Sequence, residues 1–161
     1  MNRNVFAGLA AGAAGTTALN TVTYLDMVVR ARPASSTPEE TVQRVEEQTG
    51  MSLSSLDSSA EAAANRRSGL GALLGIAAGL GVGALYGVLR PRLRGMPLAV
   101  LGADVGLAAN VGTTAPMSLL GVTNPARWSA GSWISDLVPH LAHGITTAAV
   151  WEQLSVRRRG K

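Results

Sequence analysis

Four stretches of the chain carry no charged side chain, and the charged residues are concentrated between and after them. The uncharged stretches are residues 4–25, 68–89, 105–126 and 137–151. A bilayer core about 30 Å thick is crossed by about 20 helical residues. The pattern therefore predicts an all-α polytopic membrane protein whose four transmembrane helices span residues 5–29, 68–89, 97–120 and 133–154. We expect these spans to form a single membrane domain over residues 1–161.

The long polar segment between the first two spans, residues 30–67, predicts a helical connection outside the membrane. Within it, Thr37-Pro38-Glu39-Glu40 combines a capping residue, a proline at the first helical position and acids in the first turn. Gly50 suits the left-handed residue that ends a helix. The alanine-rich part of Ser54–Asn65 favours a second short helix. Because few positions of the connection are apolar, we expect it to lie on the bilayer surface or over the bundle.

The start of the chain has two interpretations. Arg3 followed by small apolar residues is typical of a secretory signal peptide. The apolar stretch nevertheless runs on to Val29, which is longer than the hydrophobic region of such a signal. We therefore expect an uncleaved first helix.

Five glycines of the second span recur at every fourth position. They are Gly71, Gly75, Gly79, Gly83 and Gly87. Residues four apart share one face of a helix, and glycine there allows a second helix to approach to backbone contact. The ladder either packs the second span within its own bundle or docks a second protomer or another membrane protein. A four-residue repeat rotates by about 40° per step around a straight helix, so one ladder can serve both.

Aromatic and basic residues lie at the ends of the predicted spans. Trp133 and Trp151 are about 27 Å apart along a helix, which is the spacing of the two interfacial belts. The basic residues cluster in a turn, with Arg90, Arg92 and Arg94, and in the tail 155–161, with Arg157, Arg158 and Arg159. We expect both clusters to contact lipid headgroups and to hold both termini on the cytoplasmic side of a bacterial inner membrane. The arginines of the 30–67 connection argue for the opposite orientation.

The composition of the chain argues against several classes of function. Only 15% of residues are charged, against about 25% in soluble domains. Without cysteine, the chain has no disulfide, thiol nucleophile or cysteine-ligated metal. The basic isoelectric point of about 10.6 could indicate nucleic-acid binding, but the basic residues sit at span ends, so we expect no nucleic-acid partner. No phosphate-binding loop, zincin motif or nucleophile elbow is present, and we expect no catalysis by the chain itself.

Polar side chains inside the predicted spans each need an explanation, because a charge there costs about 2.5–3.5 kcal/mol on insertion scales. Asp136, His140 and His143 occupy positions i, i+4 and i+7 of the fourth span, which form one stripe. An antiparallel third span places Asn110 level with His140, and Asp104 near His143. A first span parallel to the third brings Asn20 near Asp136. These residues form the predicted intramembrane cluster: Asn20, Asp104, Asn110, Asp136, His140 and His143.

Three roles for this predicted cluster remain open. Its members either join helices through hydrogen bonds, or conduct protons or cations, or ligate a metal such as zinc or iron. A second, independent set of metal ligands is missing, and both histidines lie on one helix. We therefore expect no bound cofactor, with a metal at the Asp/His stripe as the exception to test.

Several features of the chain are shared with a known family. They are the glycine-rich first helix, the linker Arg-Pro-Ala-Ser-Ser-Thr-Pro at 32–38, the glycine-rich second helix, and His-Leu-Ala-His-Gly at 140–144. In these the chain resembles a family of small, uncharacterised actinobacterial membrane proteins with four helices. The resemblance implies the architecture and no particular chemistry.

The sequence as a whole favours a non-catalytic accessory or scaffolding subunit. It would pack through its glycine-rich helices against itself or against other proteins in the lipid bilayer. The alternative is a small proton, cation or solute transporter or channel that uses Asp104, Asp136, His140 and His143. A third possibility is a membrane enzyme or metal-binding redox subunit.

Overall fold

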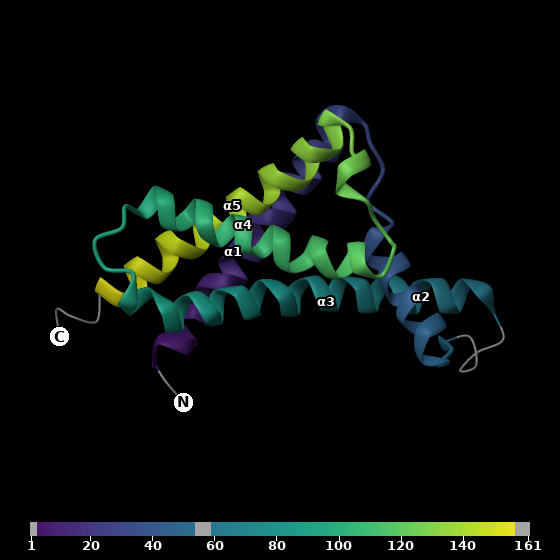
Figure 1. The fold of residues 1–161 in the computed structure, drawn as a ribbon, viewed down its shortest axis with the longest axis horizontal. Helices are drawn as coiled ribbons and strands as arrows, with labels where there is room; N and C mark the ends of the chain where they lie inside the picture. Colours follow the sequence, from purple (N-terminus) through teal and green to yellow (C-terminus); the bar gives the residue numbers. More distant parts are fainter. Residues whose placement is uncertain (1–2, 54–58, 157–161) are drawn as a thin grey trace.

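The computed structural model describes residues 3–53 and 59–156, and within them the chain forms five α-helices (Figure 1). They are α1 (Arg3–Arg30), α2 (Thr37–Thr49), α3 (Ala60–Leu89), α4 (Leu98–Leu119) and α5 (Ala130–Val156). Two short 3-10 turns, η2 (Arg90–Arg92) and η3 (Pro125–Arg127), lead into α4 and α5 respectively. The prediction of an all-α fold is confirmed.

Among the described residues, three helices are long and apolar enough to cross a membrane: α1, α3 and α4. The fourth predicted span lies in α5, which has 27 residues but is interrupted by Asp136, His140 and His143. These side chains lower its hydropathy, so hydropathy identifies three spans where four were predicted. In the bundle α5 packs on both α1 and α4, so neighbouring helices cover much of its surface.

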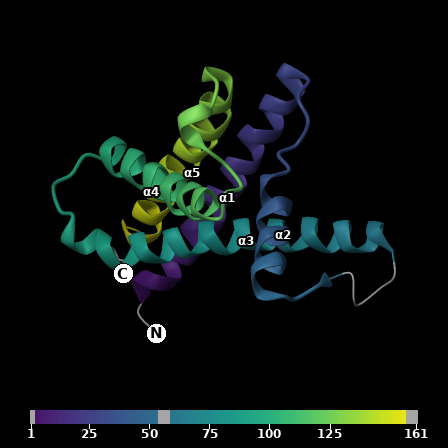
Figure 2. The same ribbon diagram turned by 45° about the vertical axis from the view of Figure 1, so that its right-hand side comes forward.

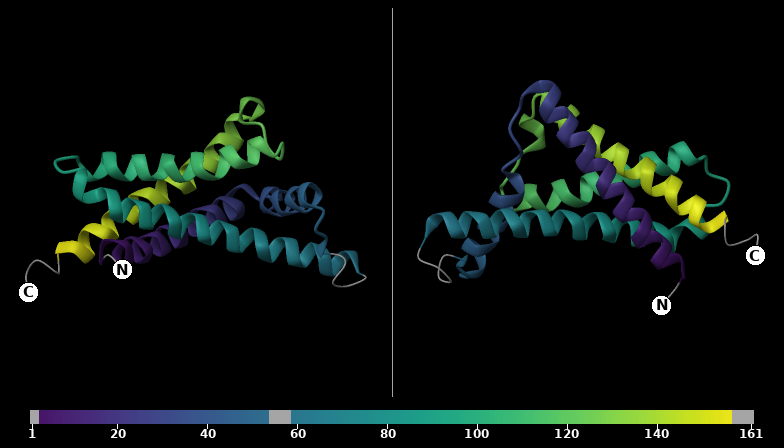
Figure 3. Two further views of the ribbon diagram at one scale, coloured as in Figure 1. Left: turned by 60° about the horizontal axis from the view of Figure 1, so that its bottom comes forward. Right: turned by 180° about the vertical axis from the view of Figure 1, so that it is seen from behind.

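Each end of the bundle brings together a different set of helix ends. The start of α1, the η2 turn and the end of α5 gather at one end (Figures 1 and 3). The end of α1, the start of α5 and α2 lie toward the other end. α3 extends beyond the other long helices, and α2 packs against the extended part (Figure 2).

The connection before α3 differs in part from the prediction. α2 begins at Thr37 and is followed by Gly50 in the left-handed region at φ +71°, as its sequence indicates. The alanines of the predicted second short helix instead form the first turns of α3. Ser59 caps this helix by accepting a hydrogen bond of 3.0 Å from the backbone N–H of Ala62. Residues 54–58 of the predicted short helix lie outside the described residues.

Glycines bring α1 and α3 to backbone contact. A Cβ atom added to Gly83 would lie 2.5 Å from the Cα of Gly12 and even closer to the carbonyl oxygen of Gly8. A Cβ atom on Gly12 would lie 2.6 Å from the carbonyl oxygen of Gly79. Real Cβ atoms do not come this close to backbone atoms, so larger residues cannot replace these glycines without moving a helix.

The five ladder glycines do not all serve this crossing. Gly79, Gly83 and Gly87 face α1, whereas Gly71 faces α2, where an added Cβ would lie 2.8 Å from the Cβ of Pro38. Gly75 has no other atom within 4 Å of the position of a Cβ. Four rungs of the ladder therefore pack within the chain, and one faces open space.

A second glycine contact, which the glycine repeat of α3 did not predict, joins α4 to α5. A Cβ on Gly144 would lie 2.6 Å from the Cα of Gly106, and a Cβ on Gly102 would lie 2.9 Å from the Cα of Ile145. The buried apolar core lies where these helices and α1 and α3 meet, and it consists of Ala7, Ala11, Tyr86, Leu101, Val105, Ala148 and Trp151. Three of these seven residues are alanines, which fit where the backbones are already close.

Alanine substitutions at Gly83 and Gly75 should have different effects on stability. A methyl group at Gly83 meets backbone atoms of α1, so we expect Gly83→Ala to lower the free energy of unfolding by about 1–3 kcal/mol. A methyl group at Gly75 enters open space and improves helix propensity, so Gly75→Ala should leave stability unchanged or raise it by up to about 1 kcal/mol. Reversible unfolding in mixed micelles, followed by circular dichroism, measures both. Equal effects would contradict the observed packing.

Candidate functional site

A network of polar side chains joins α4 to α5 near the middle of the two helices. Asn110 is 6% exposed, and its Nδ2 donates a hydrogen bond to Oδ2 of Asp136. Thr113 Oγ1 lies 3.3 Å from Nε2 of His140. On the other side of the ring, Nδ1 of His140 lies 2.7 Å from the backbone oxygen of Asp136. We call these four residues, Asn110, Thr113, Asp136 and His140, the Asn110 cluster.

The geometry indicates where the protons of the Asn110 cluster reside. A ring nitrogen 2.7 Å from a carbonyl oxygen must donate, so Nδ1 of His140 carries a hydrogen. The 3.5 Å contact between Nδ1 and Nδ2 of Asn110 then joins two donors and is not a hydrogen bond. Nε2 faces the hydroxyl of Thr113, which can donate to two backbone oxygens of α4, each at 3.1 Å. The backbone oxygen of Asp136 thus fixes the orientation of the imidazole ring.

Asp104 does not join this cluster, and the prediction that it lies near His143 is wrong. The carboxylate is exposed on the side of α4 that faces away from α5. The reason is that α4 meets α5 through Gly102 and Gly106, and a residue two positions from either lies about 200° around the helix.

His143 occupies a separate, fully buried place on the other side of α5. Its side chain is 1% exposed and lies against Gly15 of α1 and Gly79 of α3. A Cβ on Gly15 would lie 2.9 Å from Nδ1 of His143, so only glycine leaves room for the ring. Positions three apart differ by about 60° around a helix, and this rotation moves His143 out of the α4 contact that His140 makes. The predicted stripe is therefore divided between two interfaces.

The environment of His143 is tightly packed but lacks polar partners. Within residues 3–53 and 59–156, neither ring nitrogen of His143 has a hydrogen-bond partner, and nor does the hydroxyl of Thr147, one turn further along. A buried polar atom without a partner is costly. The fit of the ring between Gly15 and Gly79 indicates that His143 fills space between three helices.

Asn20 also lies outside the Asn110 cluster. Its half-buried side chain makes no hydrogen bond with the part of the chain that the structure describes. Gly15 packs on His143, and Asp26 bonds to Ser135, so the antiparallel run of α1 and α5 places Asn20 level with about residue 140. It therefore lies about one turn from the depth of Asp136, its predicted partner.

A cluster that the sequence analysis missed joins α1 to α5 at one end of the bundle. Asp26 accepts a hydrogen bond of 2.6 Å from Arg30 and forms a second ion pair with Arg32. Ser135 donates to the same carboxylate at 3.1 Å and also contacts Arg30. The spacing of Asp26 and Arg30, four residues apart on a helix, was the signal available in the sequence.

At the opposite end, Arg90 joins the η2 turn to α5. Its Nε donates to the carboxylate of Glu152 at 2.5 Å, and its guanidinium lies 6.0 Å from the centre of the Trp151 ring. Trp151 in turn packs edge-on against Tyr86, with ring centres 5.9 Å apart. This corrects the prediction that Arg90 contacts lipid headgroups, because its charge is held within the protein. Arg92 is exposed, as that prediction requires.

The remaining predicted headgroup contacts divide between exposed and undescribed positions. Arg94 is exposed in the turn before α4, and its Nε donates to the backbone oxygen of Pro91 at 3.1 Å. Arg157, Arg158 and Arg159 lie outside the described residues. Lipid contact therefore stays a prediction for Arg92, Arg94 and the tail.

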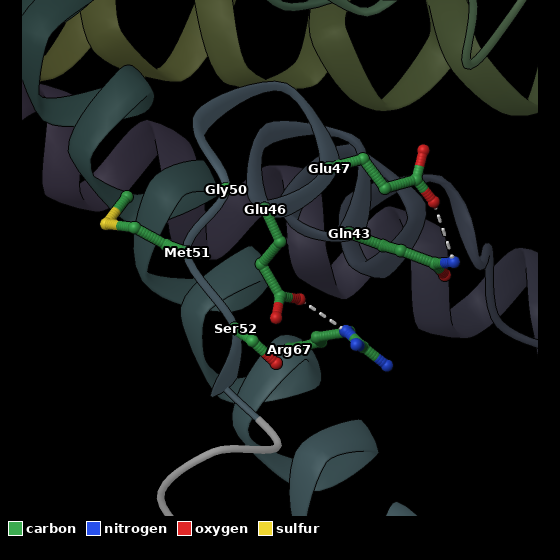
Figure 4. Close-up of a pocket in the computed structure, with 7 residues that line it drawn as sticks. All are labelled: Gln43, Glu46, Glu47, Gly50, Met51, Ser52 and Arg67. Carbon is green, nitrogen blue, oxygen red and sulfur yellow. Dashed lines mark hydrogen bonds and ion pairs between the residues drawn. The ribbon is translucent and has the colours of Figure 1, made fainter.

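An open hollow of about 250 Å³ lies between α2 and the start of α3 (Figure 4). It is lined by Gln43, Glu46, Glu47, Gly50, Met51, Ser52 and Arg67. Glu46, which is 9% exposed, accepts hydrogen bonds from Nε of Arg67 at 2.5 Å and from the backbone N–H of Leu53 at 2.7 Å. These two donors hold the pKa of Glu46 below its ordinary value of 4.5. The ion pair thus fastens α2 to α3.

The described residues bring together no group of three or more His, Cys, Asp or Glu side chains that could hold a metal ion. In comparisons with known proteins, no family model, curated protein or solved structure matches the chain. The contacts of the Asn110 cluster connect α4 to α5.

A double-mutant cycle should reveal the hydrogen bond at the centre of the Asn110 cluster. We expect Asn110→Ala and Asp136→Ala to be coupled by about 0.6–1.7 kcal/mol in the free energy of unfolding, the range found for interhelical hydrogen bonds in membranes. The matched control is Asn20→Ala with Asp136→Ala, which should be additive because Asn20 makes no such bond. Coupling in both cycles, or in neither, would contradict the geometry.

The contact between α2 and α3 should weaken in acid. The folded state depresses the pKa of Glu46, so its contribution to docking is complete above about pH 4.5 and is lost as the pH falls through the lower, folded value. Spin labels on α2 and α3 should report a constant distance at neutral pH and a longer one in acid. Glu46→Gln should loosen the contact at neutral pH and remove this pH dependence. Glu47→Gln, at an exposed ion pair with Arg44, is the control and should retain it.

Proposed function

We propose that the chain is a non-catalytic subunit of the bacterial cytoplasmic membrane that packs against other membrane proteins. In this proposal α5 is the fourth span, and both termini are cytoplasmic. The grouping of the start of α1, the basic η2 turn and the end of α5 at one end of the bundle supports this topology. The observation that carries the proposal is the way the helices pack, in which glycine backbones make the contacts and large apolar faces stay uncovered.

The uncovered faces are extensive on α3 and α4. Leu73 on α3 is 61% exposed, and Val111 on α4 is 60% exposed. Gly75 on α3 and Gly112 on α4 also open onto empty space. Lipid tails are as apolar as leucine, so an apolar surface by itself gives no reason for helices to associate in a bilayer. Small residues that admit a second backbone do give one, and they support the role of a packing subunit.

A second candidate, proton or cation transport, is supported by polar side chains that follow α5. At one end of α5, Ser135 donates a hydrogen bond to Asp26, and at the other end Glu152 pairs with Arg90. The Asn110 cluster and His143 lie between these two ends. Two observations argue against a continuous path of these side chains. Asp104 points away from the series, and His140 and His143 face different helices.

The mass of the intact assembly tests the proposal. The protein should leave its native membrane, in a mild detergent, as a complex of fixed stoichiometry with other membrane proteins, measured by native mass spectrometry. Reconstituted alone in liposomes, it should give no proton flux above that of protein-free vesicles. Recovery as a lone chain with only lipid bound would contradict the proposal. Proton flux that disappears in Asp136→Asn would favour the transport candidate instead.

A further inference from the structure

One charged side chain of the predicted spans has no partner among the residues that the structure describes. Asp104 is the seventh residue of α4, is exposed, and makes no ion pair or hydrogen bond with residues 3–53 or 59–156. It lies about 7 Å from the midpoint of α4 along the helix axis. When α4 crosses a bilayer, this depth is well inside the hydrocarbon core, and a short aspartate side chain cannot reach the headgroups. Its carboxylate therefore requires a partner from outside the described residues.

The surface around Asp104 is suited to a second helix. Val100, Leu107 and Val111 lie on the same face of α4 and are 44%, 46% and 60% exposed. Ala108 is also exposed, and Gly112 has nothing within 4 Å of the position of a Cβ. The face thus combines small residues, which admit a neighbouring backbone, with apolar flanks and one acidic group.

A second copy of this chain supplies no complementary charge at this depth. All of its basic residues lie outside the predicted spans 5–29, 68–89, 97–120 and 133–154, and the nearest to Asp104 along the chain are Arg92 and Arg94 in the turn before α4. Two copies docked through the same face around a two-fold axis would bring Asp104 against Asp104, and two like charges repel in a medium of low dielectric constant. The complementary group must come from a different protein.

We propose that the Asp104 face of α4, formed by Val100, Asp104, Leu107, Ala108, Val111 and Gly112, docks a membrane-spanning helix of a partner protein that carries a lysine or arginine at the depth of Asp104. Acidic and basic side chains within membranes pair with one another, because each then loses less by leaving water. This inference rests on the proposed function, and it names the chemistry by which the partner is recognised.

The test uses designed helices as defined probes. One probe is a membrane-spanning leucine–alanine peptide of the length of α4 with a single lysine about 7 Å from its midpoint, and the other has leucine at that position. Binding of each to the labelled full-length protein is measured by energy transfer in vesicles of phosphatidylcholine, which carry no net charge. We expect the lysine peptide to bind wild-type protein at least about tenfold more tightly than the leucine peptide does.

Two variants and a control locate the binding to this face. Asp104→Asn keeps the size of the side chain and removes its charge, so it should abolish the preference for lysine. Ala108→Leu should weaken binding of the lysine peptide by obstructing the close approach. Gly75→Leu, which fills open space on α3, should leave binding unchanged. All three positions lie at the surface, so the bundle is expected to fold in each variant.

Other results would overturn the inference. If wild type and Asp104→Asn prefer the lysine peptide equally, the carboxylate does not recognise lysine. The same conclusion follows if wild type binds the two peptides equally well. Self-association of the wild type without peptide, lost in Asp104→Asn, would make a second copy the occupant.

The proposed function can fail independently of the Asp104 face. A native complex that survives Asp104→Asn, together with no lysine preference, would refute this inference and leave the function standing. A lysine preference without any native complex would support the inference about the Asp104 face and refute the proposed function.

Discussion

The contact between bare glycine backbones is the interaction on which this structure depends. It sets the distance between α1 and α3 through Gly8, Gly12 and Gly83, and the distance between α4 and α5 through Gly106 and Gly144. In lipid, apolar side chains gain little by leaving the tails for a protein surface, whereas closely approaching backbones gain dispersion contacts along their length. The same closeness explains why alanines such as Ala7, Ala11 and Ala148 occupy buried positions between the helices.

Close packing also determines where polar groups can be placed. α5 lies between α1 and α4, so its polar side chains meet protein. At its two ends Ser135 and Glu152 bind charged residues of α1 and of the η2 turn. In between, the Asn110 cluster and His143 occupy the two faces covered by neighbouring helices. A helix that hydropathy does not identify as a span is in this way packed between two neighbouring helices, which cover its polar side chains.

Charge-free stretches and turn residues were sufficient to predict the all-α fold and the approximate positions of the long helices, because both are local properties of the chain. The antiparallel register also placed Asn110 level with His140, where the structure brings them together. The prediction failed where rotation about a helix axis matters. Asp104 and His143 were matched by depth, but Gly102 and Gly106 turn Asp104 away from α5. Ion pairs such as Arg90 with Glu152 depend on tertiary contacts that join positions far apart in the sequence.

The glycines therefore also assign different roles to similar residues. Asp136 and Asp104 are both aspartates within long helices, and both lie inside predicted spans. Because Gly144 and Gly106 draw α5 onto α4, Asp136 meets Asn110 and becomes part of the link between these helices. The same contact leaves Asp104 on the outside, where an unpaired carboxylate is tolerated only if another molecule completes it. The pattern of close backbone contact thus separates the polar groups that join helices from Asp104, to which we assign the recognition of a partner.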